Sequence, residues 1–335
     1  MRLILKLILP MILIVIGVFT FNEYQRFLTT PINVEQPNKT FTIKSGTNLQ
    51  QVGRQLGEQG ISPFPAEYLY WYGRYQQSAH RIKAGEYKLT PEQTLPELLT
   101  LFIKGDVVQH SFTIIEGMTS QQLITAIASD DRFVKTLDSY DLKAIMQLFG
   151  DNERHGEGEF APETYYFSAD TTDKAILIRA YQLMQNTLAE AWDNKADNLP
   201  YKTPYEALIM ASIIEKESGV AEERPEIAGV FIRRLQKGMR LQADPTVIYG
   251  MGVKYKGNIR RNDLRRDTVY NTYTRYGLPP SPIALPSKAA INAALNPAAG
   301  TSLYFVATGH EGRHVFSNTL VEHNKAVRQY QLKKR

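Results

Sequence analysis

An almost wholly apolar segment at the amino terminus constrains this chain most. Leu3–Phe21 is 19 residues long and contains a single charged residue, Lys6. A membrane-spanning helix needs about 20 predominantly apolar residues. Lys6 lies near the start, where its side chain can reach the lipid headgroups while the following residues fill the hydrocarbon. We therefore predict that residues 1–22 form a short cytoplasmic stub and a transmembrane anchor.

A cleaved signal peptide is the alternative for this segment. It would require a cleavage site of small residues after the apolar run, but the residues from Phe21 to Arg26 are bulky or polar. Arg2 and Lys6 lie at the amino-terminal side of the span. On the other side, residues 22–38 contain one basic residue, Arg26, and two glutamates. The positive-inside rule then leaves the amino terminus in the cytoplasm and the rest outside. No second run of comparable length occurs, so we expect a single-pass membrane protein whose working part lies beyond the membrane.

The remaining composition is that of a folded protein. Hydrophobic residues make up 43% of the 335 residues and charged residues 22%, which excludes a disordered chain and allows more than one domain. There is no cysteine, which excludes a disulfide framework, a thiolate zinc site, an iron–sulfur cluster and a cysteine nucleophile. The net charge of +5 suits an anionic polymer or a membrane surface and does not indicate nucleic acid.

Residues 23–40 contain two prolines and little periodicity, so we expect a tether there. Short segments, called phrases here, in which an expected strand, a glycine and an expected helix follow one another, then recur. The first phrase resembles a LysM module, a small unit that grips N-acetylglucosamine backbones, and the alternative is a purely structural role. We assign residues 41–108 to this LysM-like module. The expected strands are 41–43, 86–89 and 112–114, and the expected helices lie around 49–56, 95–103 and 121–127.

Residues 109–335 are expected to form a larger domain. The chain is mainly helical from Asp173 onward and ends with two strands, Leu303–Ala307 and His314–Phe316, and a closing helix over Leu320–Tyr330. The predicted fold class is α+β. It combines a single N-terminal transmembrane helix, a small LysM-like βα module, and a larger mixed domain with a helical core and a C-terminal β-hairpin.

The segment 201–219 contains the strongest helix signals. Thr203 is a good N-cap, Pro204 suits the first helical position, and Glu206 would complete a capping box. Gly219 is a natural residue to follow the helix end. We therefore predict a helix whose last turn contains Glu217.

Two glutamates in that last turn face different sides of the helix. Glu217 continues the apolar stripe of Met210, Ile213 and Ile214, whereas Glu215 lies about 200° away around the helix axis. Burial beside the stripe would raise the pKa of Glu217, as a general acid at neutral pH requires. The alternative is an ordinary surface charge near a helix end.

Residues 310–314 (HEGRH) match the H-E-x-x-H pattern of zinc peptidases. That chemistry needs both His310 and His314 on one face of a helix, with Glu311 activating a zinc-bound water. A strand-like run precedes the motif, Gly309 and Gly312 favour turns, and β-type residues follow. We therefore predict a hairpin loop and no metal site.

Several longer phrases together resemble the endolytic murein transglycosylases, the YceG-like family of bacterial inner-membrane enzymes. The resemblance covers nearly the whole chain, and the phrases are ordered. One mild departure is Glu159-Phe160-Ala161, where relatives carry more aromatic or leucine character, so the sugar-stacking surface is not specified. The matching phrases are 157–165 (EGEFAPETY), 211–217 (ASIIEKE), 240–250 (RLQADPTVIYG), 270–273 (YNTY), 277–283 (GLPPSPI), Asn296-Pro297 and 314–316 (HVF).

The resemblance implies a lyase that cuts the β-1,4 bond between N-acetylmuramic acid and N-acetylglucosamine within nascent strands, leaving 1,6-anhydro ends and terminating strand elongation. The family's catalytic glutamate falls on Glu217, which the helical-face argument also selects. No cofactor is expected. Glycan strands and the inner membrane are the expected partners, with membrane-bound cell-wall synthases as candidates. The expected substrate-binding residues, for which core or turn packing is the alternative, are Asp244, Thr246, Tyr249, Tyr270, Asn271, Thr272 and Tyr273.

Two other classes of function stay open on sequence grounds. One is a non-catalytic murein-binding scaffold that uses the LysM-like module. The other is the zinc peptidase of residues 310–314, which the missing helical context disfavours.

Overall fold

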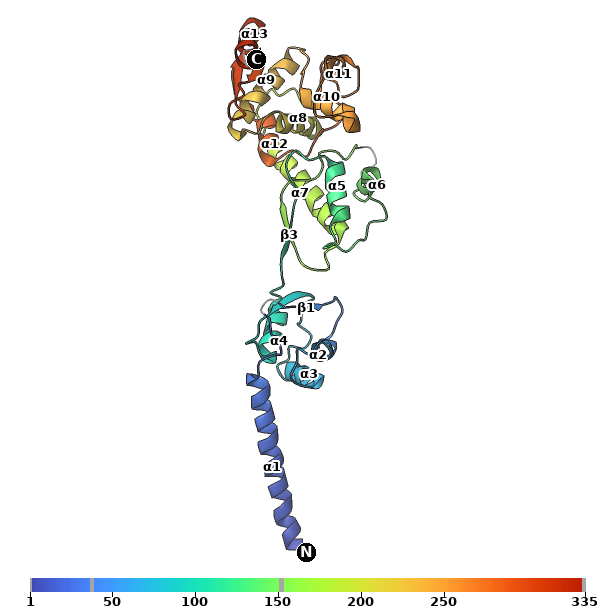
Figure 1. The fold of residues 1–335 in the computed structure, drawn as a ribbon, viewed down its shortest axis with the longest axis vertical. Helices are drawn as coiled ribbons and strands as arrows, with labels where there is room; N and C mark the ends of the chain where they lie inside the picture. Colours follow the sequence, from blue (N-terminus) through green and yellow to red (C-terminus); the bar gives the residue numbers. More distant parts are fainter. Residues whose placement is uncertain (1, 37–38, 151–153, 333–335) are drawn as a thin grey trace. The chain divides into compact units, whose positions relative to one another are not determined.

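The structure is a computed structural model that describes residues 2–36, 39–150 and 154–332. The chain divides into two compact units (Figure 1). The first comprises Met1–Ser111 and Tyr166–Thr171, and the second Phe112–Tyr165 and Thr172–Arg335. The first break lies close to the predicted boundary at residue 108, whereas the return of residues 166–171 to the first unit was not predicted.

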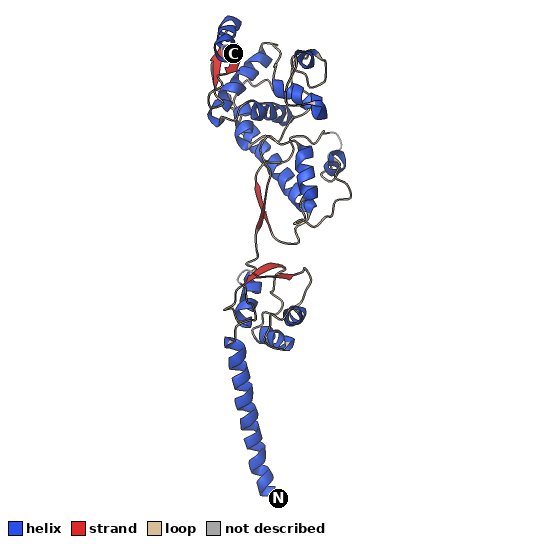
Figure 2. Cartoon of the chain, viewed as in Figure 1, coloured by secondary structure: helices blue, strands red, loops and turns tan. Residues whose placement is uncertain are grey.

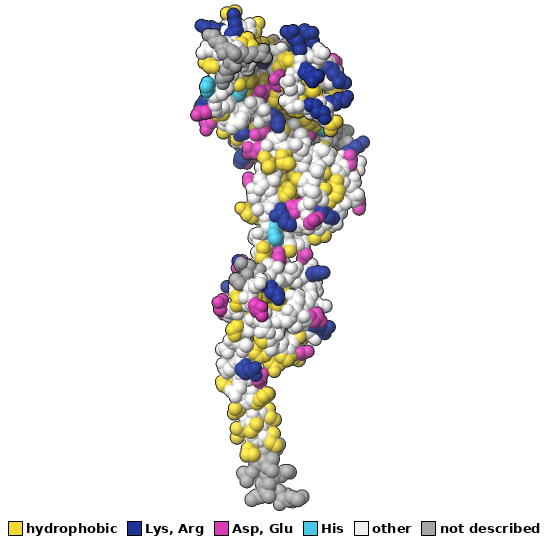
Figure 3. All heavy atoms as spheres, viewed as in Figure 1, with side chains coloured by type: hydrophobic (Ala, Val, Ile, Leu, Met, Phe, Trp, Pro, Cys, Tyr) yellow, Lys and Arg dark blue, Asp and Glu magenta, His cyan; other side chains and the backbone are white. Residues whose placement is uncertain are grey.

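The first unit begins with a long helix, α1 (Arg2–Thr29). Within it, Pro10–Thr29 is long and apolar enough to cross a membrane. The large apolar side chains from Met11 to Phe21 are exposed, and Figure 3 shows them along α1. A helix with exposed apolar side chains on all sides is typical of a segment that lipid surrounds. The side chains of Arg2 and Lys6 lie outside the described residues.

The predicted tether over 23–40 is wrong. Helix α1 continues to Thr29, and the side chain of Phe27 is buried in the core of the first unit. Ile32 and Val34 are buried in the same core. Burial of these apolar side chains outweighs the loop signals in the sequence, so the described residues from Phe27 to Val34 pack onto the module instead of forming a free tether.

The rest of the first unit is a small module with the order β–α–α–β–α. Strands β1 and β2 pair antiparallel, with Phe41 opposite Tyr87, and both side chains are buried against Phe102 of α4. The strands and helices expected from the first two phrases are confirmed, whereas α3 was not predicted. The LysM-like identity stays a prediction. The elements are β1 (Lys39–Ile43), α2 (Leu49–Glu58), α3 (Ala66–Tyr75), β2 (Gly85–Leu89) and α4 (Leu95–Lys104).

The chain leaves and re-enters the first unit through a two-stranded sheet of β3 (His110–Thr113) and β4 (Thr164–Phe167). The strand and helix expected from the third phrase are confirmed as β3 and α5 (Ser120–Ser129). Their partners differ from those of the first two phrases because β3 pairs with β4. A short helix, α6 (Leu142–Gln147), follows α5.

The second unit has a helical core centred on α8 (Pro204–Glu217), in which every residue from Ala207 to Ile214 is buried. Helices α7, α9 and α12 pack against α8 (Figure 1). The predicted helical core is therefore confirmed. The helices of this region besides α8 are α7 (Asp173–Asp193), η1 (Ala221–Glu223), α9 (Arg224–Gln236), α10 (Asp244–Met251), η2 (Gly252–Lys254), α11 (Arg261–Arg265) and α12 (Lys288–Leu295).

The C-terminal part is the predicted hairpin (Figure 2). Strands β5 (Tyr304–Ala307) and β6 (His314–Ser317) pair antiparallel, and α13 (Leu320–Val327) and η3 (Arg328–Leu332) follow. Residues 310–313 form the connecting turn, in which Glu311 has a φ of 50°. The helix that the H-E-x-x-H motif requires is therefore replaced by a hairpin loop. The ring of His314 is held by Glu223, with 2.8 Å between Nδ1 and Oε2.

Candidate active site

Helix α8 fixes where Glu217 lies. At its start, Thr203 Oγ1 accepts a hydrogen bond from the backbone N–H of Glu206 at 3.3 Å, and Pro204 follows the cap. The Glu206 carboxylate accepts a hydrogen bond from the backbone N–H of Lys202, whereas a capping box would require the backbone N–H of Thr203. Only half of the predicted capping box therefore forms. The helix ends at Glu217, as its sequence signals predicted.

The side chain of Glu217 lies at the end of a buried apolar stripe. Met210, Ile213 and Ile214 are each 0% exposed, which confirms the predicted face. Glu217 itself is half-buried. Its carboxylate forms no hydrogen bond or salt bridge with any residue that the structure describes. A carboxyl group at a helix end thus keeps both oxygens free for another molecule.

The surroundings of Glu217 favour its protonated form. Burial raises the pKa of this carboxyl to about 8, the negative charge of Asp244 adds to the rise, and the positive charge of Arg234 opposes it. A carboxyl group with a pKa near the working pH can both donate and accept a proton. Glu217 therefore has the properties of a general acid and base.

Arg234 is a buried cation that sequence reasoning missed. From α9 it donates hydrogen bonds to the backbone carbonyl oxygens of Leu303, at 2.7 Å, and Leu241. Its guanidinium also lies over the ring of Tyr304, with 5.3 Å between its carbon and the ring centroid. These contacts hold the positive charge in a fixed place, where it acts electrostatically on Glu217. The adjacent Arg233-Arg234 pair resembles a surface charge cluster in the sequence, so no local signal marks it.

Asp244 and Tyr273, both predicted site residues, come together beside Glu217. Asp244 is exposed at the first position of α10, and its Oδ1 accepts a hydrogen bond from the Tyr273 hydroxyl. Burial and this hydrogen bond raise the pKa of Tyr273, and the charge of Glu217 adds to the rise. Tyr273 therefore keeps its proton and stays a hydrogen-bond donor.

Three other predicted site residues, Thr246, Asn271 and Thr272, are buried and bonded within the protein. The hydroxyl groups of Thr246 and Thr272 lie 2.9 Å apart, and Thr272 Oγ1 accepts from the Ala243 backbone N–H at 3.0 Å. The Asn271 amide donates to three backbone carbonyl oxygens, of which the nearest, that of Arg266, is 2.7 Å away. Their polar groups hold the start of α10 and the segment that contains Asn271 and Thr272 in place. This is the role in core or turn packing that was the alternative to substrate binding.

The last two predicted residues, Tyr249 and Tyr270, belong to a polar cluster around Glu157. The Tyr249 hydroxyl donates to Glu157 Oε2 at 3.0 Å, and its ring meets that of Tyr270 edge-on. Glu157 Oε1 accepts from the Ser120 backbone N–H at 2.7 Å. Burial raises the pKa of Glu157, which is 2% exposed, while these hydrogen bonds oppose the rise. Glu157 lies between two glycines, at the start of the segment 157–165 that resembles the family. Its buried carboxylate connects Ser120 with Tyr249, and these contacts are remote in sequence, so no local pattern predicts them.

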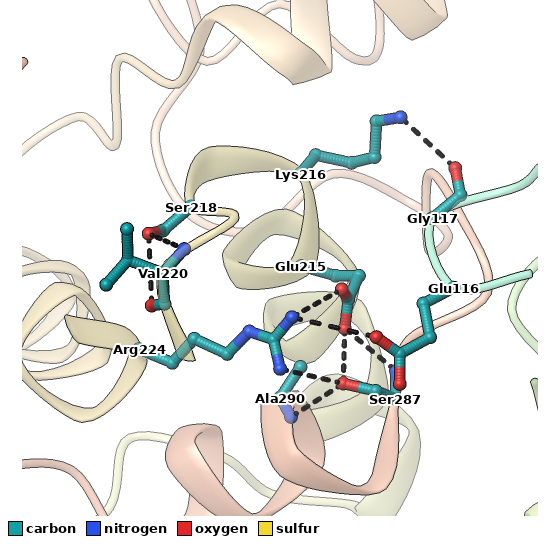
Figure 4. A network of polar contacts seen from close by, with 9 residues as sticks. All are labelled: Glu116, Gly117, Glu215, Lys216, Ser218, Val220, Arg224, Ser287 and Ala290. Atoms are coloured by element: carbon teal, nitrogen blue, oxygen red, sulfur yellow. Dashed lines mark hydrogen bonds and ion pairs between the residues drawn. The ribbon is translucent and has the colours of Figure 1, made fainter. Parts of the chain in front are cut away.

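Glu215, two residues before Glu217 in α8, has a structural role in a network of polar contacts (Figure 4). Its carboxylate accepts hydrogen bonds from Arg224, at 2.9 Å, and from the backbone N–H and hydroxyl of Ser287. Ser287 is the N-cap of α12 and Arg224 is the first residue of α9, so Glu215 joins three helices. The predicted separation of the two glutamates is therefore confirmed: the Glu215 carboxylate is bonded to Arg224 and Ser287, and that of Glu217 has no bonded partner in the part of the chain that the structure describes.

Comparison with known proteins gives consistent matches along most of the chain. The model of a family described as the YceG-like family matches residues 41–329. A Bacillus subtilis (strain 168) protein named endolytic murein transglycosylase is 33% identical over 329 residues, which cover 92% of this chain and 89% of that protein.

A protein of the same name from Streptococcus pneumoniae serotype 2 is 28% identical over 344 residues. That match covers 92% of this chain but only 61% of the longer pneumococcal protein. Among solved structures, the crystal structure of a YceG-like protein from Listeria monocytogenes superimposes with a TM-score of 0.52 at 27% identity. It covers 86% of this chain and 99% of the Listeria chain.

Proposed function

This chain belongs to the YceG-like family, and on that premise we propose that it is an endolytic murein transglycosylase, a lyase that cuts peptidoglycan glycan strands. The proposal extends to the bond that is cut, the β-1,4 linkage between N-acetylmuramic acid and N-acetylglucosamine. The free carboxyl of Glu217, with its raised pKa, is the observation that carries the proposal.

The chemistry needs one group that gives and then takes a proton. In the first step Glu217 donates its proton to the glycosidic oxygen while the bond from that oxygen to C1 of the muramyl sugar breaks. The C6 hydroxyl of the same sugar then attacks C1, and the Glu217 carboxylate accepts the hydroxyl proton. The product carries a 1,6-anhydro end, no water is consumed, and Glu217 is protonated again.

Three neighbouring groups support this cycle. The oxocarbenium-like transition state carries positive charge on the sugar, which the exposed carboxylate of Asp244 can stabilise. Arg234 stabilises Glu217 in its transient anionic form. Tyr273, which is bonded to Asp244, orients that carboxylate. By contrast, ordinary glycosidases use a pair of carboxyl groups that flank the bond, and here the substrate hydroxyl replaces the second one.

The test compares wild type with Glu217→Gln and Glu222→Gln on purified glycan strands. Glu222 is an exposed glutamate close in sequence and serves as the matched control. Gln keeps the shape of Glu217 but cannot donate the proton, so release of anhydro-muropeptides, measured by mass spectrometry, should fall by about 10²–10⁴-fold. Glu222→Gln should behave as wild type.

The products distinguish the proposal from its alternatives. Anhydro ends support a lytic transglycosylase, and wild-type rates in Glu217→Gln would exclude Glu217 as the acid. Binding of strands without products would indicate a murein-binding scaffold. Cleavage of peptide bonds would indicate a peptidase.

The wider setting is part of the same proposal. Helix α1 is proposed to anchor the chain in the bacterial inner membrane with its amino terminus in the cytoplasm and the rest in the periplasm. The module over 39–104 is proposed to hold the N-acetylglucosamine backbone as LysM modules do. Cutting close to the membrane would terminate nascent strands, which makes membrane-bound cell-wall synthases the candidate protein partners.

A further inference from the structure

Helix α3 of the first unit carries an unusual set of aromatic side chains. Its ten residues include four tyrosines and a tryptophan. Only Leu69 and Gly73 of this helix are buried. Trp71 and Tyr75 are 65% and 77% exposed. Large aromatic side chains that stay exposed on a small folded module indicate a surface with a partner.

These side chains lie beside the end of α1. Phe27 of α1 packs on Tyr72 of α3, with ring centroids 5.3 Å apart, and on Phe64, at 5.6 Å. An apolar pocket opens between the two helices, and Phe19, Tyr24 and Phe27 of α1 line it together with Tyr68, Trp71, Tyr72 and Tyr75 of α3. The position of α3 along α1 is therefore fixed by side-chain packing.

That position coincides with the end of the apolar part of α1. The continuous run of exposed apolar side chains ends at Phe21, and the polar residues Asn22, Glu23 and Arg26 follow, with the amphipathic Tyr24 among them. When α1 spans a bilayer, the hydrocarbon ends near Phe21. The pocket includes residues on both sides of this level, from Phe19 to Phe27. Trp71 and Tyr75 then reach the lipid headgroups, the layer in which tryptophan and tyrosine are enriched in membrane proteins.

We propose that α3 is a membrane-interface helix whose Trp71 and Tyr75 insert among the glycerophospholipid headgroups of the bilayer that α1 spans. Arg74, which precedes Tyr75 in α3, is exposed and can pair with lipid phosphate. Together, α1 and α3 hold the module in one orientation on the membrane surface, which a single helix on a flexible linker could not do. This inference rests on the anchoring role proposed for α1.

Tryptophan fluorescence can measure the depth of Trp71. The chain has two tryptophans, so Trp192→Phe leaves Trp71 alone in the full-length protein. The protein is reconstituted into phosphatidylethanolamine and phosphatidylglycerol vesicles that contain brominated lipids. Bromines near the headgroups should quench Trp71 strongly, and bromines near the chain ends should quench it weakly. If neither brominated lipid quenched the fluorescence of Trp71, the proposal would be overturned.

Two single-tryptophan variants, made in a Trp71→Phe/Trp192→Phe background, separate this inference from the anchor. Ile14→Trp reports α1 and should be quenched by the deep bromines. Thr42→Trp lies exposed on β1, outside the pocket, and should not be quenched. If Ile14→Trp is not quenched, the anchor itself is wrong. If it is quenched and Trp71 is not, only the role of α3 is wrong.

A second measurement is independent of Trp192, whose replacement could disturb the second unit. The chain has no cysteine, so Tyr75→Cys carries a nitroxide label at a single site. The label should be more accessible to oxygen, which enters membranes, than to a water-soluble nickel complex. The same label at Thr42→Cys should show the reverse order. A label at residue 75 with the accessibility of residue 42 would contradict the proposal.

Discussion

The two glutamates of the last turn of α8 show how the surroundings of a residue decide its role. Glu215 is bonded to Arg224 and Ser287, whereas Glu217 has no bonded partner among the described residues. Their sequence neighbourhoods are nearly the same. The direction each side chain takes from the helix separates a structural carboxylate from a reactive one.

Glu215→Ala should destabilise the second unit, because it removes the nearer partner of the buried Arg224 and leaves that charge with the exposed Glu116 carboxylate, 3.8 Å away. Breaking a buried ion pair costs about 3–5 kcal/mol, so urea denaturation should show a loss of this order. Glu217→Gln should unfold no earlier than wild type, since it removes no bond. Equal losses in the two variants would contradict the division of roles.

The proton on Glu217 predicts how activity depends on pH. Because its pKa is about 8, the acid form is populated below that pH and is lost above it. The rate of anhydro-end formation at low substrate concentration should therefore fall as pH rises through about 8. Measurement of this rate against pH tests the prediction, and a decline centred near the ordinary carboxyl pKa of 4.5 would contradict it.

The same proton links stability to pH. The folded state holds it more tightly than the unfolded state, where the pKa is close to 4.5. The contribution of Glu217 to stability is therefore most favourable below about 4.5 and is lost as pH rises towards about 8. Over this range Glu217→Gln should become more stable relative to wild type, as thermal unfolding at several pH values would show. A constant difference would mean that the pKa is not raised.

At the scale of elements, loops far apart in sequence support α8. Gly158 has a φ of 80°, and a Cβ atom there would lie 2.5 Å from Cβ of Pro282. Ser212 of α8 accepts a hydrogen bond from the backbone N–H of Ile283 at 2.9 Å, which ties the segment next to Pro282 to α8. The glycine therefore permits a close contact between two loops that surround this helix.

Gly158→Ala should destabilise the second unit by about 1–3 kcal/mol, because the added methyl group clashes and the backbone conformation is strained. Gly219→Ala is the control, since no atom lies within 4 Å of a Cβ there and its φ is not in the left-handed region. It should change the free energy of unfolding by less than about 1 kcal/mol. Chemical denaturation of both variants measures the difference, and similar values for the two would contradict the clash.

Sequence patterns located most elements but not their partners. The end signals of α8 and the alternation around Phe41 are local, and they predicted the bounds of that helix and the strand β1. Helix α3 was not predicted, although Tyr68, Trp71, Tyr72 and Tyr75 recur at the i, i+3, i+4 and i+7 spacing of one helical face. The predicted tether was wrong because burial of Phe27, Ile32 and Val34 depends on a core built from later residues.

At the scale of the whole molecule, the two units have separate hydrophobic cores. Leu56 lies in the core of the first unit and Leu208 in that of the second, and both are 0% exposed. Leu56→Ala and Leu208→Ala should each cost about 2–5 kcal/mol. Hydrogen exchange followed by mass spectrometry should show faster exchange confined to the unit that carries the substitution. Loss of protection in both units from either variant would show that they unfold together.

Local sequence patterns determined the apolar helix at the amino terminus, the helix α8, the hairpin at residues 304–317 and the side of α8 on which Glu217 lies, because each depends on residues that are close in sequence. Tertiary packing decided which groups surround Glu217. Arg234 and Asp244 come from separate segments, and their charges act on Glu217 only when the core brings them together. The raised pKa is a sum of burial and distant charges, and no local pattern in the chain encodes that sum.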